Sequence, residues 1–129
     1  MSEQTNKAVQ FRRLHEGPGA FVIANAWDAG SARVLAGLGF PALATSSAAA
    51  ASSVGRRDGE ITREQALANA AAIAGATTLP VSADLGKGYT DDPAGVAETI
   101  RLAAEAGVVG ASIEDATGDP ARPLFELEL

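Results

Sequence analysis

The chain has 129 residues, enough for one domain with a buried core, whereas a closed eight-stranded β/α barrel needs about 250 residues. Ten Lys and Arg against sixteen Asp and Glu give a formal net charge of -6, which argues against a nucleic-acid partner and favours a small molecule. The absence of cysteine excludes disulfides, thiolate catalysis and Cys-ligated zinc.

The first half of the chain contains two segments typical of buried parallel strands. The N-terminal segment, which carries His15, is predicted to be a helix. It lacks the apolar core of a signal peptide, and no run in the chain reaches the roughly 18 apolar residues of a membrane helix, so a cytoplasmic protein without a membrane partner is expected. Strands are predicted over 20–24 and 41–44, with a short helix over 31–36 between them. The stretch from Ala48 to Glu60 has no clear period.

The second half repeats the same alternation. Thr62 and Gln65 have the spacing of a capping box, which predicts a helix running to about Gly75. Asp92 followed by Pro93 predicts the start of another helix. Strands are predicted over 79–84 and 108–113, and residues 124–129 are predicted to begin a further helix.

This alternation of strands and helices implies a parallel sheet within one domain, residues 1–129. Periodicity does not distinguish an open doubly wound sheet from part of a barrel. A dinucleotide-binding sheet would carry Gly-x-Gly-x-x-Gly after its first strand, and residues 25–30 lack that pattern. An open flavodoxin-like sheet for a phosphorylated ligand is therefore the weaker alternative.

Two carboxylates stand where strands end. Asp84 closes the third predicted strand and Glu114 follows the fourth. Because the carboxyl ends of parallel strands meet on one face, both acids can converge on one ligand. One or two carboxylates with water and substrate oxygens suffice for Mg²⁺. The residues alone are equally compatible with an alternative in which both acids cap helices or form ion pairs.

Other candidates follow the first two strands. Ser46 and Ser47 could hold a ligand carboxylate, although a serine pair in a turn is more often structural. Asp58 lies in a glycine-flanked loop with two arginines, which suits either a lid or an ordinary solvated loop. Trp27 and Tyr89 lie near strand ends and could either wall a pocket or cover the core.

With these motifs in view, the chain resembles the isocitrate lyase and phosphoenolpyruvate mutase superfamily from Phe21 onward. The resemblance rests on five motifs in the family's order: Asn25-Ala-Trp-Asp-Ala-Gly-Ser-Ala-Arg33, Ala44-Thr-Ser-Ser47, Gly55-Arg-Arg-Asp58-Gly59, Val81-Ser-Ala-Asp84 with Gly88-Tyr89, and Ala111-Ser-Ile-Glu-Asp-Ala116. It implies a TIM-type (β/α)8 barrel fold and Mg²⁺-dependent chemistry on a small 2-oxo acid or dicarboxylate through an enolate-like intermediate.

The resemblance also implies residue roles. Asp84 and Glu114 would belong to the Mg²⁺ site, and Thr45, Ser46 and Ser47 would cradle the substrate carboxylate. Asp58 would lie on the gating loop as a catalytic residue, and Trp27 is expected to contact substrate.

Three departures from the family pattern qualify these expectations. Ser82 stands where many members have a second aspartate, so the metal site has one carboxylate fewer. The Lys-Lys-Cys-Gly-His motif of the lyase branch is absent, so a carboxyphosphonoenolpyruvate phosphonomutase-like branch fits better. Lys87 replaces an expected neutral polar residue.

Length is the larger departure, because four predicted strands match only the N-terminal half of an eight-stranded barrel. We expect a half-barrel with helices on one side, either a fragment, a truncated product or a homo-oligomer that pairs through its open edges. A noncatalytic half-barrel that binds a small dicarboxylate is the alternative function.

Overall fold

Strands and helices alternate along most of the chain, as the sequence predicts. The computed structural model describes residues 2–126. Its elements, in chain order, are α1 (Glu3–Glu16), β1 (Ile23–Asn25), α2 (Ala29–Gly37), β2 (Ala42–Ala44), α3 (Ser47–Ser53), α4 (Arg63–Gly75), β3 (Val81–Asp84), α5 (Pro93–Glu105), β4 (Gly110–Ser112), β5 (Ala116–Asp119) and β6 (Arg122–Leu124).

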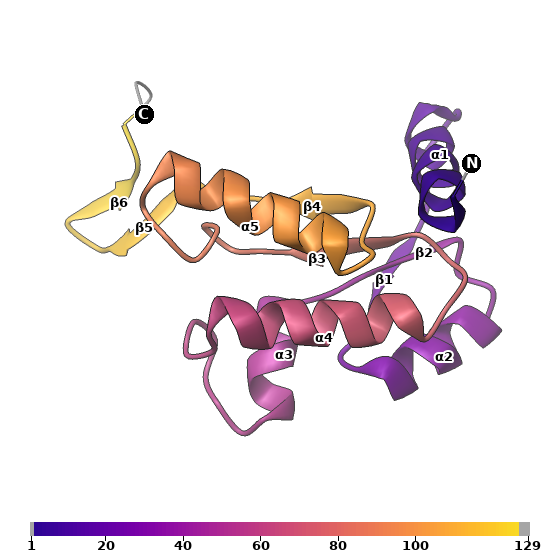
Figure 1. Cartoon of the computed structure of the whole chain (residues 1–129), viewed down its shortest axis with the longest axis horizontal. Coiled ribbons are helices and arrows are strands. Elements are labelled where there is room, and N and C mark those ends of the chain that lie inside the picture. The colour runs from indigo at the N-terminus through magenta and orange to yellow at the C-terminus, as the bar shows by residue number, and fades with distance from the viewer. Residues whose placement is uncertain (1, 127–129) are drawn as a thin grey trace.

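The main sheet has the strand order β1-β2-β3-β4, and every pairing in it is parallel (Figure 1). A right-handed crossover between neighbouring strands always delivers its helix to the same face, so a sequential order places the connecting helices in one layer. Helix α4 accordingly contacts both α2 and α5. An open flavodoxin-like sheet has a strand order that reverses, as 2-1-3-4-5 does. The sequential order therefore supports the half-barrel and not the open sheet.

Local signals set the helix starts as predicted. Thr62 and Gln65 form a capping box at α4, and Asp92 caps α5 with Pro93 in the first turn. Asp28 and Ser31 form a second capping box at α2, which begins before the predicted range. Each strand lies largely within its predicted segment but is shorter.

The two faces of the sheet carry different side chains. Leu43, Val81 and Ala83 face the helices and are almost completely buried, forming the main apolar core. On the opposite, inner face Ala44 pairs with Ser82, which pairs with Gly110, so these small residues form one row.

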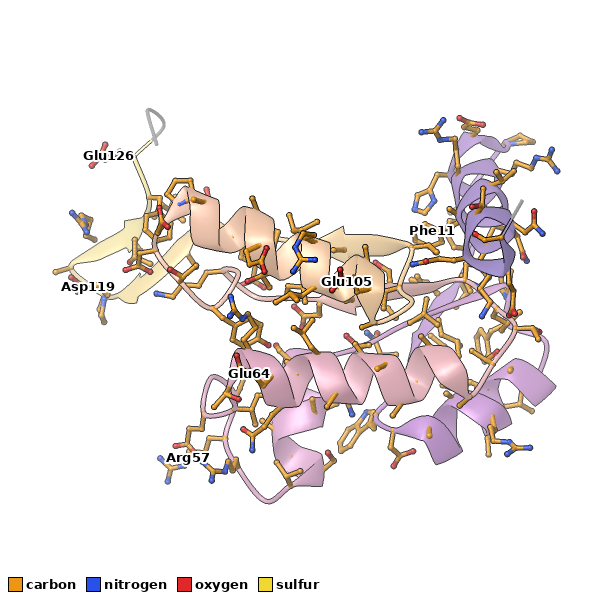
Figure 2. All side chains as sticks on the ribbon, in the orientation of Figure 1. Phe11, Arg57, Glu64, Glu105, Asp119 and Glu126 are labelled. Carbon is orange, nitrogen blue, oxygen red and sulfur yellow. The ribbon has the colours of Figure 1, made fainter. Side chains whose placement is uncertain are left out.

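Helix α1 covers part of this inner face. Figure 2 shows Phe11 reaching from α1 toward β4. A Cβ atom placed on Gly110 would lie 2.6 Å from the Phe11 ring and 3.1 Å from the Ser82 hydroxyl oxygen. Gly110 is therefore required because the phenyl ring packs directly on the strand.

Three elements, α3, β5 and β6, were not predicted. Helix α3 lies within the stretch that shows no period, because its buried residues are Ala49, Ala50 and Ala51 and a run of small residues gives no apolar contrast. The predicted helix over 124–129 is wrong at its start, since Leu124 pairs with Ala116 in the antiparallel β5–β6 hairpin. Residues 127–129 of that prediction lie outside the described residues.

No helix between residues 2 and 126 is long and apolar enough to cross a membrane.

Candidate functional site

The carboxyl ends of β1 to β4 surround a cavity of ≈ 370 Å³, here called the strand-end cavity. Its lining includes seven polar residues of the strands and the segments that follow them: Asn25, Thr45, Ser46, Ser82, Asp84, Ser112 and Glu114. Both acids predicted to bind metal therefore reach one cavity from neighbouring strands. This convergence follows from the parallel, in-register pairing of β3 with β4.

Asp84 is held in place by backbone donors. The Ser47 N–H donates to one carboxylate oxygen at 2.8 Å, and the Gly86 N–H donates to the other at 3.1 Å. The Asp84 N–H in turn donates to the Thr45 hydroxyl at 3.0 Å. Burial by itself raises the pKa of the Asp84 carboxyl, but the hydrogen bonds from Ser47 and Gly86 outweigh it and leave the pKa below its ordinary value. Asp84 is therefore an ionised oxygen donor at neutral pH.

Glu114 is exposed and follows β4, and its backbone N–H donates to the Gly86 carbonyl at 2.8 Å. Gly86 thus joins the backbone of Glu114 to the carboxylate of Asp84. Within residues 2–126 no group of three or more His, Asp or Glu side chains is placed to hold a metal ion. Two carboxylates beside serine hydroxyls still fit Mg²⁺, which prefers oxygen donors and retains several waters.

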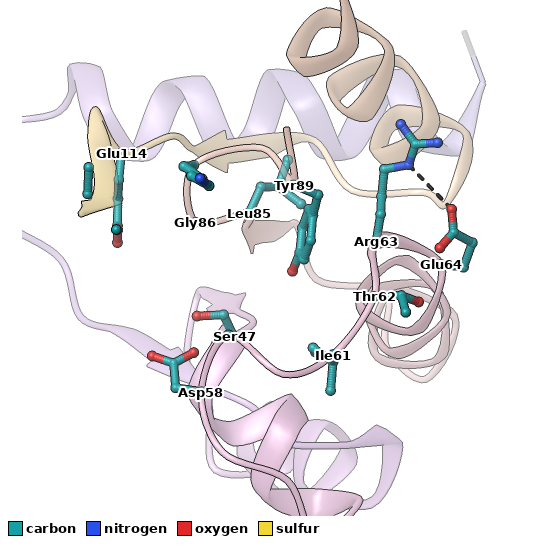
Figure 3. A pocket seen from close by; sticks show the side chains of 14 residues that line it. Ser47, Asp58, Ile61, Thr62, Arg63, Glu64, Leu85, Gly86, Tyr89 and Glu114 are labelled. Atoms are coloured by element: carbon teal, nitrogen blue, oxygen red, sulfur yellow. Dashed lines mark ion pairs between the residues drawn. The ribbon is translucent and has the colours of Figure 1, made fainter. Parts of the chain in front are cut away.

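A second cavity of ≈ 850 Å³, here called the larger cavity, adjoins the first at Glu114, which lines both. Figure 3 shows Ser47, Asp58 and Tyr89 around it. Asp58 is exposed on the loop that follows α3, so the loop with the two arginines does border a cavity. The structure thereby brings Asp58, Ser47 and Glu114 to one space.

The three residues expected to cradle a carboxylate have different surroundings. Thr45 is buried and accepts from the Asp84 N–H, and the Ser47 N–H is bound to the Asp84 carboxylate. Ser46 caps α3 by accepting from the Ala49 N–H at 3.3 Å. Thr45 and the Ser47 amide therefore position Asp84, while Ser46 and Ser47 line the strand-end and larger cavities respectively.

Trp27 is not brought together with these residues. Its side chain is 53% exposed and lines neither the strand-end nor the larger cavity. Its backbone is fixed by the Ser31 hydroxyl and by the Asn69 side chain.

Sequence reasoning missed Asn25 as a site residue and left Tyr89 as either the wall of a pocket or a cover of the core. Asn25 ends β1, lines the strand-end cavity and donates from its side chain to the Thr45 carbonyl at 2.9 Å. Its position at a strand end was the signal that could have identified it. Tyr89 stands near a strand end in the sequence, but its place in the larger cavity depends on how the loop after β3 folds.

Four sequential parallel strands with acids gathered at their carboxyl ends define a β/α-barrel type of site. Residues 11–129 match the family model described as phosphoenolpyruvate phosphomutase, and the chain belongs to this family. The predicted resemblance is thereby confirmed.

Known relatives agree with this assignment. An uncharacterized protein of Mycobacterium tuberculosis is 37% identical over 112 residues, which are 86% of this chain and 42% of that protein. A candidate lyase/mutase of Burkholderia cenocepacia J2315 has a crystal structure that is 54% identical, with a TM-score of 0.96, over 98% of this chain and 46% of the other.

Two solved enzymes are also similar. A 2,3-dimethylmalate lyase of the PEP mutase/isocitrate lyase superfamily is 35% identical, with a TM-score of 0.82, over 95% of this chain and 44% of that one. Oxaloacetate acetylhydrolase in complex with its product oxalate is 28% identical, with a TM-score of 0.81, over 93% of this chain and 43% of that one. This chain thus spans somewhat less than half the length of these relatives.

Proposed function

We propose that this chain carries part of a Mg²⁺-dependent lyase or mutase site for a small 2-oxo acid or related carboxylate, where a C–C or P–C bond is cleaved or formed. The observation that carries the proposal is the Asp84 carboxylate, held ionised by two backbone N–H groups in the cavity that Glu114 also lines. The similarity to lyases and mutases supports the reaction class.

Asp84 and Glu114 are the residues that would hold Mg²⁺, directly or through water. When bound, the ion supplies positive charge beside a substrate oxygen on which negative charge develops. The Ser46 hydroxyl binds the substrate carboxylate in the strand-end cavity, the Ser47 hydroxyl contacts the part of a substrate that enters the larger cavity, and Thr45 keeps the backbone of Asp84 in place. Asp58, on a loop beside the larger cavity, transfers a proton to or from the part of the substrate that lies there.

The assay is turnover of oxaloacetate, phosphonopyruvate and a 2-alkylmalate, measured with Mg²⁺ and after chelation. We expect turnover of at least one acid that requires Mg²⁺ and is lost in Asp84→Ala. Asp119→Asn, an exposed change in the β5–β6 hairpin outside both cavities, is the control and should retain activity. Absence of Mg²⁺ dependence across the panel contradicts the proposal.

The second candidate is a noncatalytic half-barrel that binds a small dicarboxylate. It is favoured by the absence of a third acidic or histidine ligand within the described residues and by Ser82 in the strand-end cavity. Calorimetry that shows Mg²⁺-dependent oxalate binding, together with no turnover of the panel, would support this candidate over the enzyme.

We further propose that residues 1–129 form one domain that assembles into a homo-oligomer in the cytoplasm. In the described sheet β1 and β4 are each paired on one side, and unpaired edges favour association with another chain. Light scattering with and without Mg²⁺ and oxalate distinguishes a monomer from a pair by a twofold difference in mass. A monomer under every condition contradicts the oligomer.

A further inference from the structure

The loop after β3 holds Tyr89 in an unusual backbone conformation. Its φ is 66°, the only positive φ among the non-glycine residues between 2 and 126. A bulky residue adopts this strained conformation only where its surroundings impose it. Such backbone outliers cluster at ligand sites.

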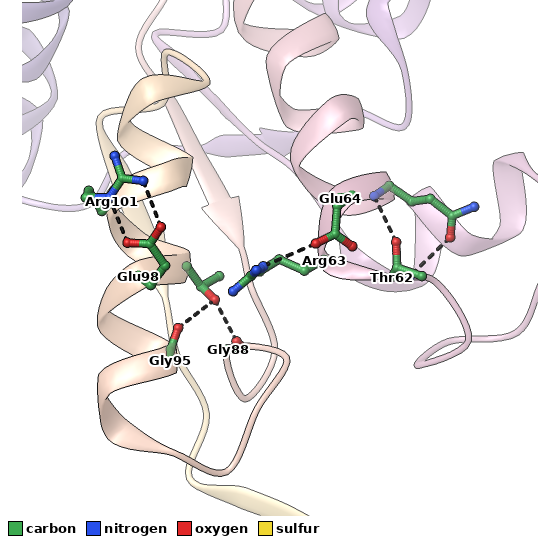
Figure 4. A network of polar contacts seen from close by, with 9 residues as sticks. Thr62, Arg63, Glu64, Gly88, Gly95, Glu98 and Arg101 are labelled. Atoms are coloured by element: carbon green, nitrogen blue, oxygen red, sulfur yellow. Dashed lines mark hydrogen bonds and ion pairs between the residues drawn. The ribbon is translucent and has the colours of Figure 1, made fainter.

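Buried contacts from α5 impose the conformation. Thr99 is 0% exposed, and its hydroxyl donates to the Gly88 carbonyl at 2.9 Å. The Gly95 carbonyl, 3.1 Å from the same hydroxyl oxygen, is its second acceptor (Figure 4). A Cβ atom on Gly88 would lie 2.8 Å from a Val96 methyl, so only glycine fits there. The peptide that precedes Tyr89 is therefore fixed from one side by a hydrogen bond and from the other by packing.

The ring of Tyr89 is fixed as well. It packs against the main core and also against the small cluster of Ala50, Ala51, Ile61 and Ala66. In Figure 3 the hydroxyl end of the ring points across the larger cavity toward Ser47. The Tyr89 hydroxyl forms no hydrogen bond with any group of residues 2–126. Every buried side-chain oxygen in these residues has a hydrogen-bond partner, so the Tyr89 oxygen is not buried and is open to the cavity.

The hydroxyl is a donor at neutral pH. Burial raises the pKa of the Tyr89 phenol, and the negative charges of Asp84 and Asp58 raise it further. Lys87 and Arg63 also line the larger cavity, but each is paired with a neighbouring acid, Asp91 and Glu64 respectively. The rigid phenol is thus a preorganised donor that has no acceptor on the described chain.

Glu114 lines both cavities, so the two adjoin at this residue. A two-carbon acid such as oxalate needs only the strand-end cavity, whereas a longer acid bound there by one carboxylate extends past Glu114 into the larger cavity. We propose that Tyr89 is a specificity-determining residue, whose hydroxyl donates a hydrogen bond to an oxygen on the distal part of a substrate of four or more carbons. This inference rests on the proposed function and adds a substrate-length requirement to it.

The test uses Tyr89→Phe, which keeps the ring and its packing and removes only the hydroxyl. Calorimetry of the 129-residue chain with Mg²⁺ measures oxalate and malate. We expect the Kd for malate to rise about tenfold, as for one hydrogen bond to a carboxylate, while the Kd for oxalate changes less than about twofold. Ser53→Ala removes a hydroxyl that lines neither cavity and should change neither Kd.

A spectroscopic readout is available because Tyr89 is the only tyrosine in the chain. Malate should perturb the tyrosine band of the ultraviolet difference spectrum, and oxalate should not. If oxalate binds but malate neither binds nor perturbs Tyr89, or if Tyr89→Phe weakens both ligands equally, the inference is overturned while the proposed function stands. If neither ligand binds in the presence of Mg²⁺, the proposed function fails and the inference fails with it.

Discussion

The backbone N–H of Ser47 donates a 2.8 Å hydrogen bond to the carboxylate of Asp84, a residue 37 positions further along the chain. This bond joins the first turn of α3 to the end of β3, two elements that meet only because β2 and β3 are neighbours in the sheet. It orients the carboxylate and keeps it ionised, so it connects the stability of the fold to the candidate metal site.

Asp84→Asn should weaken both the fold and metal binding. The amide has one acceptor oxygen instead of two, so either the Ser47 or the Gly86 N–H loses its partner, at a cost of about 1–2 kcal/mol for a half-buried site. Urea unfolding measures the stability, and calorimetry with MgCl₂ and oxalate measures the metal-dependent binding. Unchanged binding in a folded variant would remove Asp84 from the site.

The stability that Asp84 contributes should depend on pH in a defined direction. Its pKa in the folded chain lies below the ordinary value of about 3.9, so the unfolded chain binds more protons near that pH. The contribution is therefore complete above about pH 5 and is lost as the pH falls through the folded pKa. Urea unfolding of the native chain and of Asp84→Asn should give a constant difference near neutrality and a shrinking one below about pH 4. A difference that grows on acidification would contradict this sign.

Thr99→Val should release the loop that carries Tyr89. Valine keeps the volume of threonine but leaves the Gly88 carbonyl without its buried donor, which should lower the free energy of unfolding by about 1–3 kcal/mol. Thr99→Ser retains the hydroxyl and serves as the matched variant. Thermal unfolding measures the stability of both, and hydrogen exchange of the Gly88 amide, which donates to the Leu85 carbonyl at 2.9 Å, should be faster only in the valine variant.

Lys87→Met should loosen the β5–β6 hairpin with little effect on global stability. The Lys87 ammonium donates to the Thr117 carbonyl at 3.0 Å and pairs with Asp91 at 2.6 Å. Because the side chain is about one-third exposed, the expected loss is below about 1 kcal/mol. Hydrogen exchange of the Phe125 amide, which donates to the Asp115 carbonyl at 2.9 Å beside the hairpin, should be faster than in the native chain. Lys7→Met, which removes a lysine bound to the Thr77 carbonyl far from the hairpin, should leave that exchange rate unchanged.

Elements with strong local signals could be predicted from the sequence. Capping residues such as Thr62 and Asp92 act within one turn of the chain, so α4 and α5 start where the sequence predicts. Helix α3 and the β5–β6 hairpin could not be predicted. Ala49 to Ala51 have no apolar contrast, and Leu124 takes its strand conformation from its pairing with Ala116.

The candidate site divides in the same way. The sequence by itself determined that Asp84 and Glu114 stand at strand ends and that the chain resembles a family of lyases and mutases, because strand length and motif spacing are local properties. Only the tertiary structure decided the sequential strand order, the binding of Asp84 by Ser47, and the exposure of Trp27 outside both cavities. The same holds for Tyr89, whose direction is fixed by Thr99 across the α5 interface. These relationships depend on contacts between residues distant in sequence, so periodicity along the chain cannot predict them.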